Sequence, residues 1–335
     1  MKLVKSCIAM TVCSLFSASI VAAEQAPIKT QNTEVADFYG KLNISLQASD
    51  EGDGSFNELK SNASRVGVKG AYKLDTDYGL TAIYKLEWQV NVDDDSKGSL
   101  TARNQWVGVK GSFGEVTVGR SDTTLKVSQG KFDLFNDYEG DLKNLFIGEN
   151  RVTDALTYKS PSFNHVKFLA SYILSEDKNL SDPFSVGVQF GDTSLKKTNF
   201  FVSLAHDENM QGKNAIYQTT RLVGMYKIGN VRIGGILTES EVSGVFDNAY
   251  IDYVGSSENG YAANVSYKMG KVLAKVQYQE FAGADAISIG ADYKLGKSTK
   301  VFAWYTDREG LSFNEQTIKK ATEGTYFAIG MEQKF

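Results

Sequence analysis

The chain is poor in cysteine and proline, with two and three among 335 residues, and it lacks any long apolar run. A membrane-spanning helix needs about 20 predominantly apolar residues. The mean hydropathy of −0.27 and the absence of such a run therefore exclude a helical membrane protein. Lys and Arg number 36 against 40 Asp and Glu, a formal charge of −4. This balance lacks the cationic surface that binding to phosphate backbones requires, so we expect no nucleic-acid partner.

The N-terminus has the features of an export signal. Two lysines precede an apolar stretch, and Val21-Ala22-Ala23 ends it with the small residues that a signal peptidase reads. We expect residues 1–23 to be a signal peptide and residues 24–335 to form the mature protein. Both cysteines lie in the signal, so the exported protein cannot depend on disulfide bonds for its stability.

Beyond about residue 36, apolar and polar residues alternate in short runs separated by clusters of Gly, Asp, Asn and Ser. In the stretch 84–90, for example, Lys85, Glu87 and Gln89 stand between apolar residues. A period of two is typical of a strand with one dry face and one wet face. Most runs have the length of about 9–11 residues that a tilted membrane strand needs. The expected strands are 36–48, 63–74, 79–91, 102–110, 115–121, 151–160, 165–174, 183–191, 197–205, 217–227, 231–239, 259–268, 272–281, 286–294, 299–307 and 323–335.

Short and long connections alternate along the chain. This alternation is typical of a membrane barrel with short periplasmic turns and longer external loops. The sequence therefore predicts an all-β fold: a transmembrane, antiparallel, up-and-down β-barrel of about 16 strands. The expected short connections are 75–78, 111–114, 161–164, 228–230 and 295–298, and the expected long ones are 49–62, 121–150, 206–216, 240–258 and 308–322.

A Tyr-Lys pair closes five strands that lead into expected short turns. In each pair the tyrosine falls on the apolar face and the lysine on the polar face, which places the ring at the lipid interface and the ammonium group in water. A charge on the lipid face at mid-membrane would cost about 2–4 kcal/mol, so this parity is informative. The pairs are Tyr72-Lys73, Tyr158-Lys159, Tyr226-Lys227, Tyr267-Lys268 and Tyr293-Lys294.

Five short motifs occur in a fixed order along the chain. They are Phe38–Lys41, Ser64–Gly70, Arg103–Lys110, Gly119-Arg120 and Asn150-Arg151. Together they resemble the Gram-negative general diffusion porins over essentially all of the mature chain. The resemblance implies an outer-membrane channel, water-filled and homotrimeric, through which ions and small hydrophilic solutes diffuse passively.

The same resemblance implies that the third loop, residues 121–150, folds into the barrel and narrows the pore. Lys41 and Arg65 lie on the polar faces of two clear strands, and the loop is too long for a simple connector. The acidic stretch 133–141 resembles the loop tip of that family. By position, the resemblance places Lys41, Arg65, Arg103 and Arg151 on the basic side of the constriction and Asp133, Asp137 and Glu139 on the acidic side.

The last residue, Phe335, follows an alternating strand with Phe327, Ile329 and Met331 on its parity. A terminal phenylalanine of this kind resembles the signature by which outer-membrane barrels are recognised for assembly. The expected partners are therefore the barrel assembly machinery, outer-membrane lipid and lipopolysaccharide.

Two other functions fit the sequence less well. An outer-membrane hydrolase needs a Ser or Asp activated by His, and the chain has only His165 and His206, at an expected turn and loop start. We therefore expect no catalysis and no cofactor. A sugar-specific porin is the closer alternative, and its mark would be an aromatic track to which Phe132, Phe135 and Tyr138 could contribute.

Ion selectivity and metal binding are less defined by the sequence. The acidic overall charge favours cations, whereas four basic wall residues favour anions, so the sign of the selectivity stays open. Asp93-Asp94-Asp95 lacks the ligand spacing of a dedicated calcium site. We expect an exposed loop there, or a bridge to lipopolysaccharide through divalent ions, and no metal site.

Overall fold

The computed structural model describes residues 36–335 apart from 94–97, 213, 247, 313–319 and 322. The expected signal peptide and part of the 93–95 stretch lie outside the described residues. Among the residues described, no helix combines the length and the apolar character of a membrane span.

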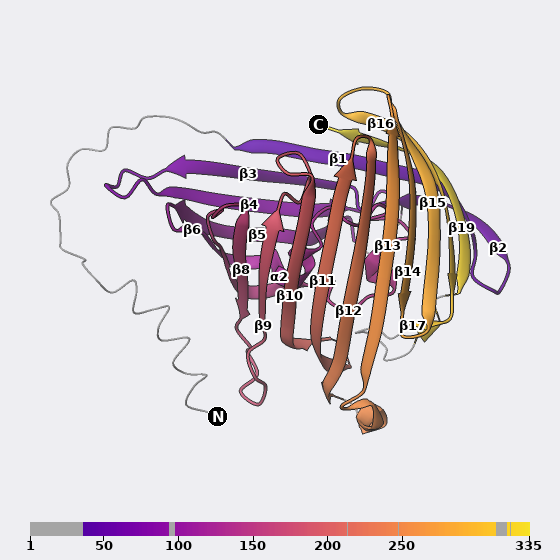
Figure 1. Cartoon of the computed structure of the whole chain (residues 1–335). Coiled ribbons are helices and arrows are strands. Elements are labelled where there is room, and N and C mark those ends of the chain that lie inside the picture. The colour runs from indigo at the N-terminus through magenta and orange to yellow at the C-terminus, as the bar shows by residue number, and fades with distance from the viewer. Residues whose placement is uncertain (1–35, 94–97, 213, 247, 313–319, 322) are drawn as a thin grey trace. The chain divides into compact units, whose positions relative to one another are not determined.

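The strands form one closed antiparallel sheet (Figure 1). Strand β1 (Asp37–Asp50) pairs on one side with β2 (Ser55–Ser61) and β3 (Arg65–Lys73), and on the other with the last strand, β19 (Gly324–Lys334). Because β2 and β3 together form one barrel strand, the 17 segments of the sheet make a 16-strand barrel. The predicted up-and-down barrel is confirmed.

The other strands follow one another around the barrel in chain order. They are β4 (Thr81–Val90), β5 (Leu100–Gly111), β6 (Gly114–Asp122), β7 (Arg151–Lys159), β8 (Val166–Ile173), β9 (Phe184–Gly191), β10 (Phe200–Gln211), β11 (Ala215–Ile228), β12 (Val231–Val245), β13 (Ser257–Met269), β14 (Val272–Phe281), β15 (Ala284–Lys294) and β16 (Thr299–Glu309). The remaining elements are α2 (Thr124–Ser128), η1 (Leu142–Asn144), η2 (Asn248–Tyr253) and the small hairpin of β17 (Leu311–Ser312) and β18 (Lys320–Ala321).

The two faces of the wall differ as the alternation predicts. In β10, Val202 and Leu204 are exposed on the outer face, whereas Ser203 and Ala205 are buried on the inner face. The tyrosines of the five Tyr-Lys pairs are 37–47% exposed, which places them on the outer side, the one that the sequence predicts to face lipid. The inner face is thus built from small and polar side chains, and these support the functional site.

The strands are longer than expected on one side of the barrel. The expected loop 206–216 is reduced to residues 212–214, because β10 and β11 stay paired across a bulge at Asn209, whose φ is +56°. Strand β12 has 15 residues, whereas β8 and β9 have eight each. The expected loop 49–62 likewise contains β2, which pairs with β1. Residues 62–64 then interrupt the strand before β3 begins.

Candidate functional site

The longest connection, residues 123–150 between β6 and β7, lies against the inner face of the wall and is called L3 below. The Leu134 backbone N–H donates to Gln277 Oε1 at 3.0 Å. Asn264 Nδ2 donates to the Phe132 carbonyl at 2.7 Å. Because Gln277 and Asn264 have the inward parity of β14 and β13, L3 is fastened to the inside of the barrel.

Aromatic side chains hold the middle of L3 against the wall. Phe132 and Phe135 are completely buried, and Tyr138 is 6% exposed. The ring centroid of Tyr138 lies 5.0 Å from that of Phe302 and 5.6 Å from that of Trp304. The three L3 aromatics therefore anchor the loop, and they do not form the solute-facing track that the sugar-specific alternative requires.

Asp137 contacts two of the basic residues singled out from the sequence, Lys41 and Arg65. Its Oδ2 atom lies 2.8 Å from Lys41 Nζ and 2.5 Å from Arg65 Nη2. Lys41 and Arg65 are register partners on β1 and β3, so their side chains converge on the same point. Burial raises the pKa of Asp137, but the charges of Arg65 and Lys41 outweigh it and hold that pKa below its usual value.

Arg103 and Arg151 lie on the same wall but pair with acids of the wall itself. Arg103 Nε lies 3.0 Å from Glu87 Oε1, and Arg151 Nη2 lies 2.9 Å from Asp122 Oδ1. Neither acid was among the expected site residues. The parity of β4 could have identified Glu87, because it stands between Lys85 and Gln89 on the polar face, whereas Asp122 is the last residue of β6 and no alternation marks its direction.

Asp133 lies in a different setting from the one expected. Its carboxylate accepts hydrogen bonds from the backbone N–H groups of Phe135 (2.9 Å) and Leu142 (3.0 Å) and from Gln277 Nε2 (3.2 Å). Burial and the nearby Asp141 raise its pKa well above the usual value. Asp133 thus fastens the turn of L3, and none of its described ion-pair or hydrogen-bond contacts is with a basic wall residue.

Glu139 also departs from the expected arrangement, because its partners are not the four basic residues of the prediction. It contacts Lys60 of β2, and its Oε2 atom lies 3.3 Å from Arg308 Nη2 of β16. Burial raises the pKa of Glu139, but the charges of Lys60 and Arg308 outweigh it and lower that pKa. Glu139 therefore ties the tip of L3 to two further strands.

A cavity of about 620 Å³ separates L3 from the wall formed by β3 to β7. Five expected residues line it: Arg65, Arg103, Arg151, Asp133 and Asp137. Its lining holds seven Lys or Arg residues and six Asp or Glu residues. The lining thus has one more basic than acidic side chain. The lining residues not anticipated from the sequence are Lys85, Glu87, Gln89, Asn104, Asp122, Lys126, Val127, Gln129, Gly130, Lys131, Asn136, Asp141, Lys143, Glu149 and Thr193.

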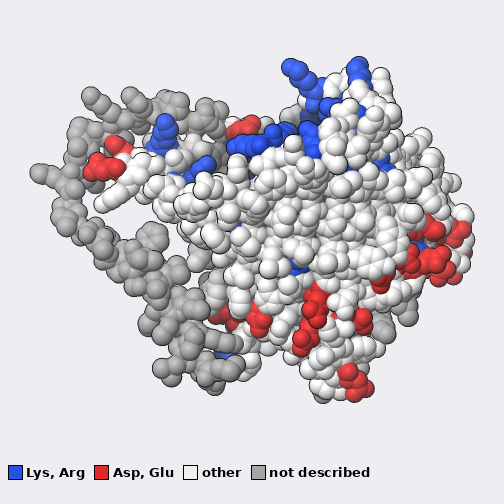
Figure 2. Space-filling view, viewed as in Figure 1, with Lys and Arg blue, Asp and Glu red and all other residues white. Residues whose placement is uncertain are grey.

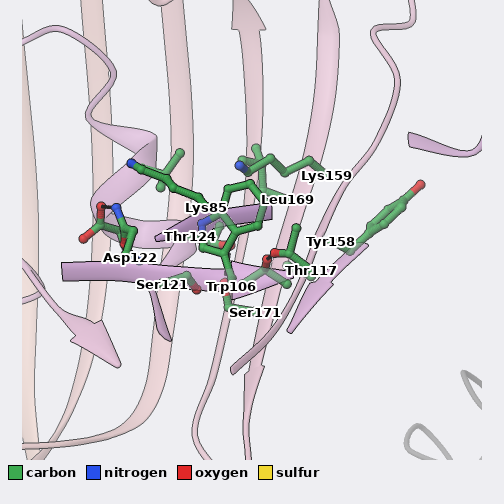
Figure 3. A pocket seen from close by; sticks show the side chains of 14 residues that line it. Lys85, Trp106, Thr117, Ser121, Asp122, Thr124, Tyr158, Lys159, Leu169 and Ser171 are labelled. Atoms are coloured by element: carbon green, nitrogen blue, oxygen red, sulfur yellow. Dashed lines mark hydrogen bonds between the residues drawn. The ribbon is translucent and has the colours of Figure 1, made fainter. Parts of the chain in front are cut away.

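A smaller recess of about 160 Å³ shares Lys85, Asn104, Asp122 and Val127 with this cavity (Figure 3). Figure 3 shows the Trp106 ring beside Lys85, with hydroxyl groups around them. The buried Ser121 hydroxyl has no hydrogen-bond partner among the described residues. The recess therefore offers the Trp106 ring and several polar groups to water or to a small polar solute.

The far end of L3 is held by a buried ion pair. Arg221 of β11 is completely buried, and its Nη1 lies 2.5 Å from Glu149 Oε1. Its Nη2 donates to the Ile147 carbonyl at 2.6 Å. Gln129 Nε2, at the start of L3, donates to the other Glu149 oxygen at 3.1 Å. The two ends of L3 are thus linked to each other and to the wall.

Comparisons with known proteins agree with this architecture. Residues 9–310 match the sequence model of the Gram-negative porin family. The major outer membrane protein P.IB of Neisseria meningitidis is 25% identical over 81% of this chain and 83% of its own length. A monosaccharide porin of a Halomonas species is 24% identical over 96% of this chain and 90% of its own length. The anion-selective porin from Comamonas acidovorans superposes with a TM-score of 0.72 at 19% identity, covering 90% of this chain and 99% of that one.

Proposed function

The chain belongs to the Gram-negative porin family and forms an outer-membrane channel for passive diffusion, and we propose that L3 and the facing wall are its constriction. The observation that carries this proposal is the charged cavity of about 620 Å³ between L3 and the wall. Asp137 of L3 pairs there with Lys41 and Arg65, and further arginines lie on the wall. Opposed charges in a narrow aqueous neck create a transverse field that orders water and favours dipolar solutes over apolar ones.

General diffusion is the transport mode that we propose. The burial of Phe132, Phe135 and Tyr138 supports it, because these rings are not available to bind a sugar. Liposome swelling with sugars of graded size tests the mode. We expect the rate to decline smoothly with solute size, whereas saturation by one sugar would contradict general diffusion.

A weak preference for anions is the selectivity that we propose for the constriction. The seven basic and six acidic residues of the lining support it. The fold similarity to an anion-selective porin agrees with this direction. The reversal potential across a KCl gradient in a planar bilayer tests it, and a potential of the cation-selective sign would contradict it.

A sugar-specific channel is the second candidate, and the Trp106 recess is the observation that favours it. An aromatic side chain beside hydroxyl and charged groups suits a sugar ring, which has apolar faces and polar edges. The swelling assay separates the two candidates. If Trp106→Ala abolished a saturable uptake of one monosaccharide, the specific channel would replace general diffusion.

Three further features belong to the same proposal: removal of residues 1–23 on export, assembly as a homotrimer, and contact of the barrel with lipopolysaccharide. The exposed Phe335, at 65%, agrees with recognition of the chain end by the assembly machinery. Mass spectrometry of protein purified from outer membranes tests the cleavage site. Sedimentation of the detergent-solubilised protein tests for three copies.

We also propose that the chain is not an enzyme. His206 contacts the Thr220 hydroxyl through Nδ1 at 2.8 Å and Glu208 through Nε2 at 3.1 Å. This arrangement lies on the outer face of β10, away from the cavity behind L3. Among the described residues, no group of three or more His, Cys, Asp or Glu side chains is arranged to hold a metal ion.

A further inference from the structure

Lysines surround the end of the barrel at which the shortest turns lie. Six of them stand at or near the ends of β3, β7, β11, β13, β15 and β19, and are called the lysine ring below: Lys73, Lys159, Lys227, Lys268, Lys294 and Lys334. Five follow an outward-facing tyrosine directly, so they have the inward parity. Lys334 shares the parity of Glu332, which is 7% exposed, opposite to the exposed Met331. The ring therefore faces the mouth of the channel.

Most of this charge is not neutralised locally. Lys159 lies 3.3 Å from Glu115, and Lys334 lies 3.2 Å from Glu332. The other four lysines of the ring make no ion pair with any described residue. The exposed Asp75 and Asp77, in the turn after Lys73, offset part of this charge, but the lysines of the ring outnumber them and give this mouth a positive field.

The opposite mouth has the opposite charge. Exposed acids occupy its loops and strand ends, among them Asp53, Asp93, Asp177, Glu241, Asp252 and Glu309. Figure 2 shows most Lys and Arg gathered towards the upper edge and most Asp and Glu towards the lower and right-hand edges, with a few acids also near the upper edge. The molecule thus has a charge asymmetry along the channel axis that the small net charge of −4 conceals.

Such an asymmetry acts on mobile ions. A positive mouth enriches anions and a negative mouth enriches cations, over a distance of about 10 Å at 0.1 M salt and about 30 Å at 0.01 M. A voltage that moves anions in through the lysine ring and cations in through the acidic mouth fills the channel with both carriers. The reverse voltage draws both anions and cations out of the channel, so the constriction carries less current.

We propose that the channel is a rectifier at low ionic strength, with the higher current at the voltage that moves anions in through the lysine ring. The inference rests on the proposed passive channel and adds the direction in which current passes more easily. Because the cause is electrostatic, it disappears when salt screens the mouths, at about 1 M, where the screening length is about 3 Å.

Current–voltage curves of the purified full-length mature protein in planar bilayers test the proposal. At 10 mM KCl we expect the currents at opposite voltages of equal size to differ by roughly twofold or more, and at 1 M KCl to be equal. Polyglutamate, an anionic polymer, is added to one chamber at a time to identify the lysine side. It should reduce the current only from the chamber that faces the ring.

Two matched variants separate charge from structure. The first carries Lys73→Gln, Lys227→Gln, Lys268→Gln and Lys294→Gln, and should bring the current ratio close to one while keeping the conductance in 1 M KCl. The second replaces the same lysines with arginine and should keep the ratio of the wild type. Equal currents in the wild type at 10 mM KCl, or an unchanged ratio in the glutamine variant, would overturn the inference. Loss of conductance altogether would instead count against the passive channel.

Discussion

Gly40 and Phe335 exchange two backbone hydrogen bonds, one of 2.9 Å from Gly40 N–H and one of 3.1 Å from Phe335 N–H. Through this exchange the last residue of the chain extends the pairing of β19 with β1 that closes the barrel. The phenyl ring lies so close to Gly40 that an added Cβ would be 2.4 Å from Phe335 Cζ and 2.9 Å from the Arg65 carbonyl oxygen. Glycine is therefore required at this junction.

The first prediction concerns this junction. Gly40→Val should destabilise barrel closure by about 1–3 kcal/mol, because the new side chain meets both a ring and a backbone carbonyl. The fraction of folded protein can be measured by its faster migration in unheated SDS gels. Gly224→Val is the matched control, because a Cβ at Gly224 would meet no atom within 4 Å. Equal folded fractions for the two variants would show that the junction tolerates side chains.

The second prediction concerns Asp137. Asp137→Asn removes the negative charge between Lys41 and Arg65, so the reversal potential should move towards anions. Asp177→Asn, in an exposed loop, is the control and should have a much smaller effect. If the two variants shifted the reversal potential equally, Asp137 would not lie in the constriction.

The third prediction follows from the lowered pKa of Asp137. A carboxyl group with a lowered pKa keeps its charge, and its contribution to stability, until the pH falls through that lowered value. The difference in reversal potential between the wild type and Asp137→Asn should therefore persist from pH 7 to about pH 4, the ordinary range of an aspartate, and vanish only at lower pH. A difference that disappeared between pH 6 and pH 5 would contradict the strong pairing with Arg65 and Lys41.

The fourth prediction separates Asp133 from Asp137. The pKa of Asp133 is raised, so its charged form opposes folding, and stability should fall as the pH rises through the ordinary carboxyl range towards the raised value. Asp133→Asn should weaken this pH dependence in thermal unfolding curves. It should also move the reversal potential by less than half as much as Asp137→Asn does, because the Asp133 carboxylate accepts hydrogen bonds from the L3 backbone and pairs with no basic wall residue described. A shift as large as that of Asp137→Asn would place Asp133 among the selectivity residues.

The fifth prediction tests how L3 is held. Arg221→Met leaves Glu149 buried without its cation, a change that typically costs about 3–5 kcal/mol. We expect a lower unfolding midpoint in guanidinium chloride and larger fluctuations of the single-channel current. The double variant with Glu149→Gln should recover much of the stability, because no buried charge then remains unpaired. Failure of the second substitution to recover any stability would show that packing, not the ion pair, fixes the loop end.

The barrel could be predicted from the sequence because each strand obeys a rule that acts residue by residue. Alternation decides which side faces lipid, and this is why Tyr72 and its counterparts were placed correctly. Loop lengths were less predictable. The bulge at Asn209 shifts the register, and polar residues on either side of it continue the strands where the pattern indicates a loop.

The site was predictable only in part, because its geometry depends on how L3 turns. Lys41 and Arg65 lie on regular strands, so parity and register bring them together, and they meet Asp137. Asp133 and Glu139 lie on the turning backbone of L3, where no period fixes the direction of a side chain. The Asp133 carboxylate faces the loop backbone, and the Glu139 carboxylate faces Lys60 and Arg308.

The unequal strand lengths give the barrel an uneven wall. At about 3.4 Å per residue and a tilt of about 40°, the 15 residues of β12 rise roughly 39 Å, well beyond an apolar band about 25 Å tall. The eight residues of β8 rise only about 21 Å by the same reckoning. The paired wall is therefore taller beside β12 than beside β8, and above β8 the rim is formed by the connection 174–183, which has fewer strand hydrogen bonds to hold it.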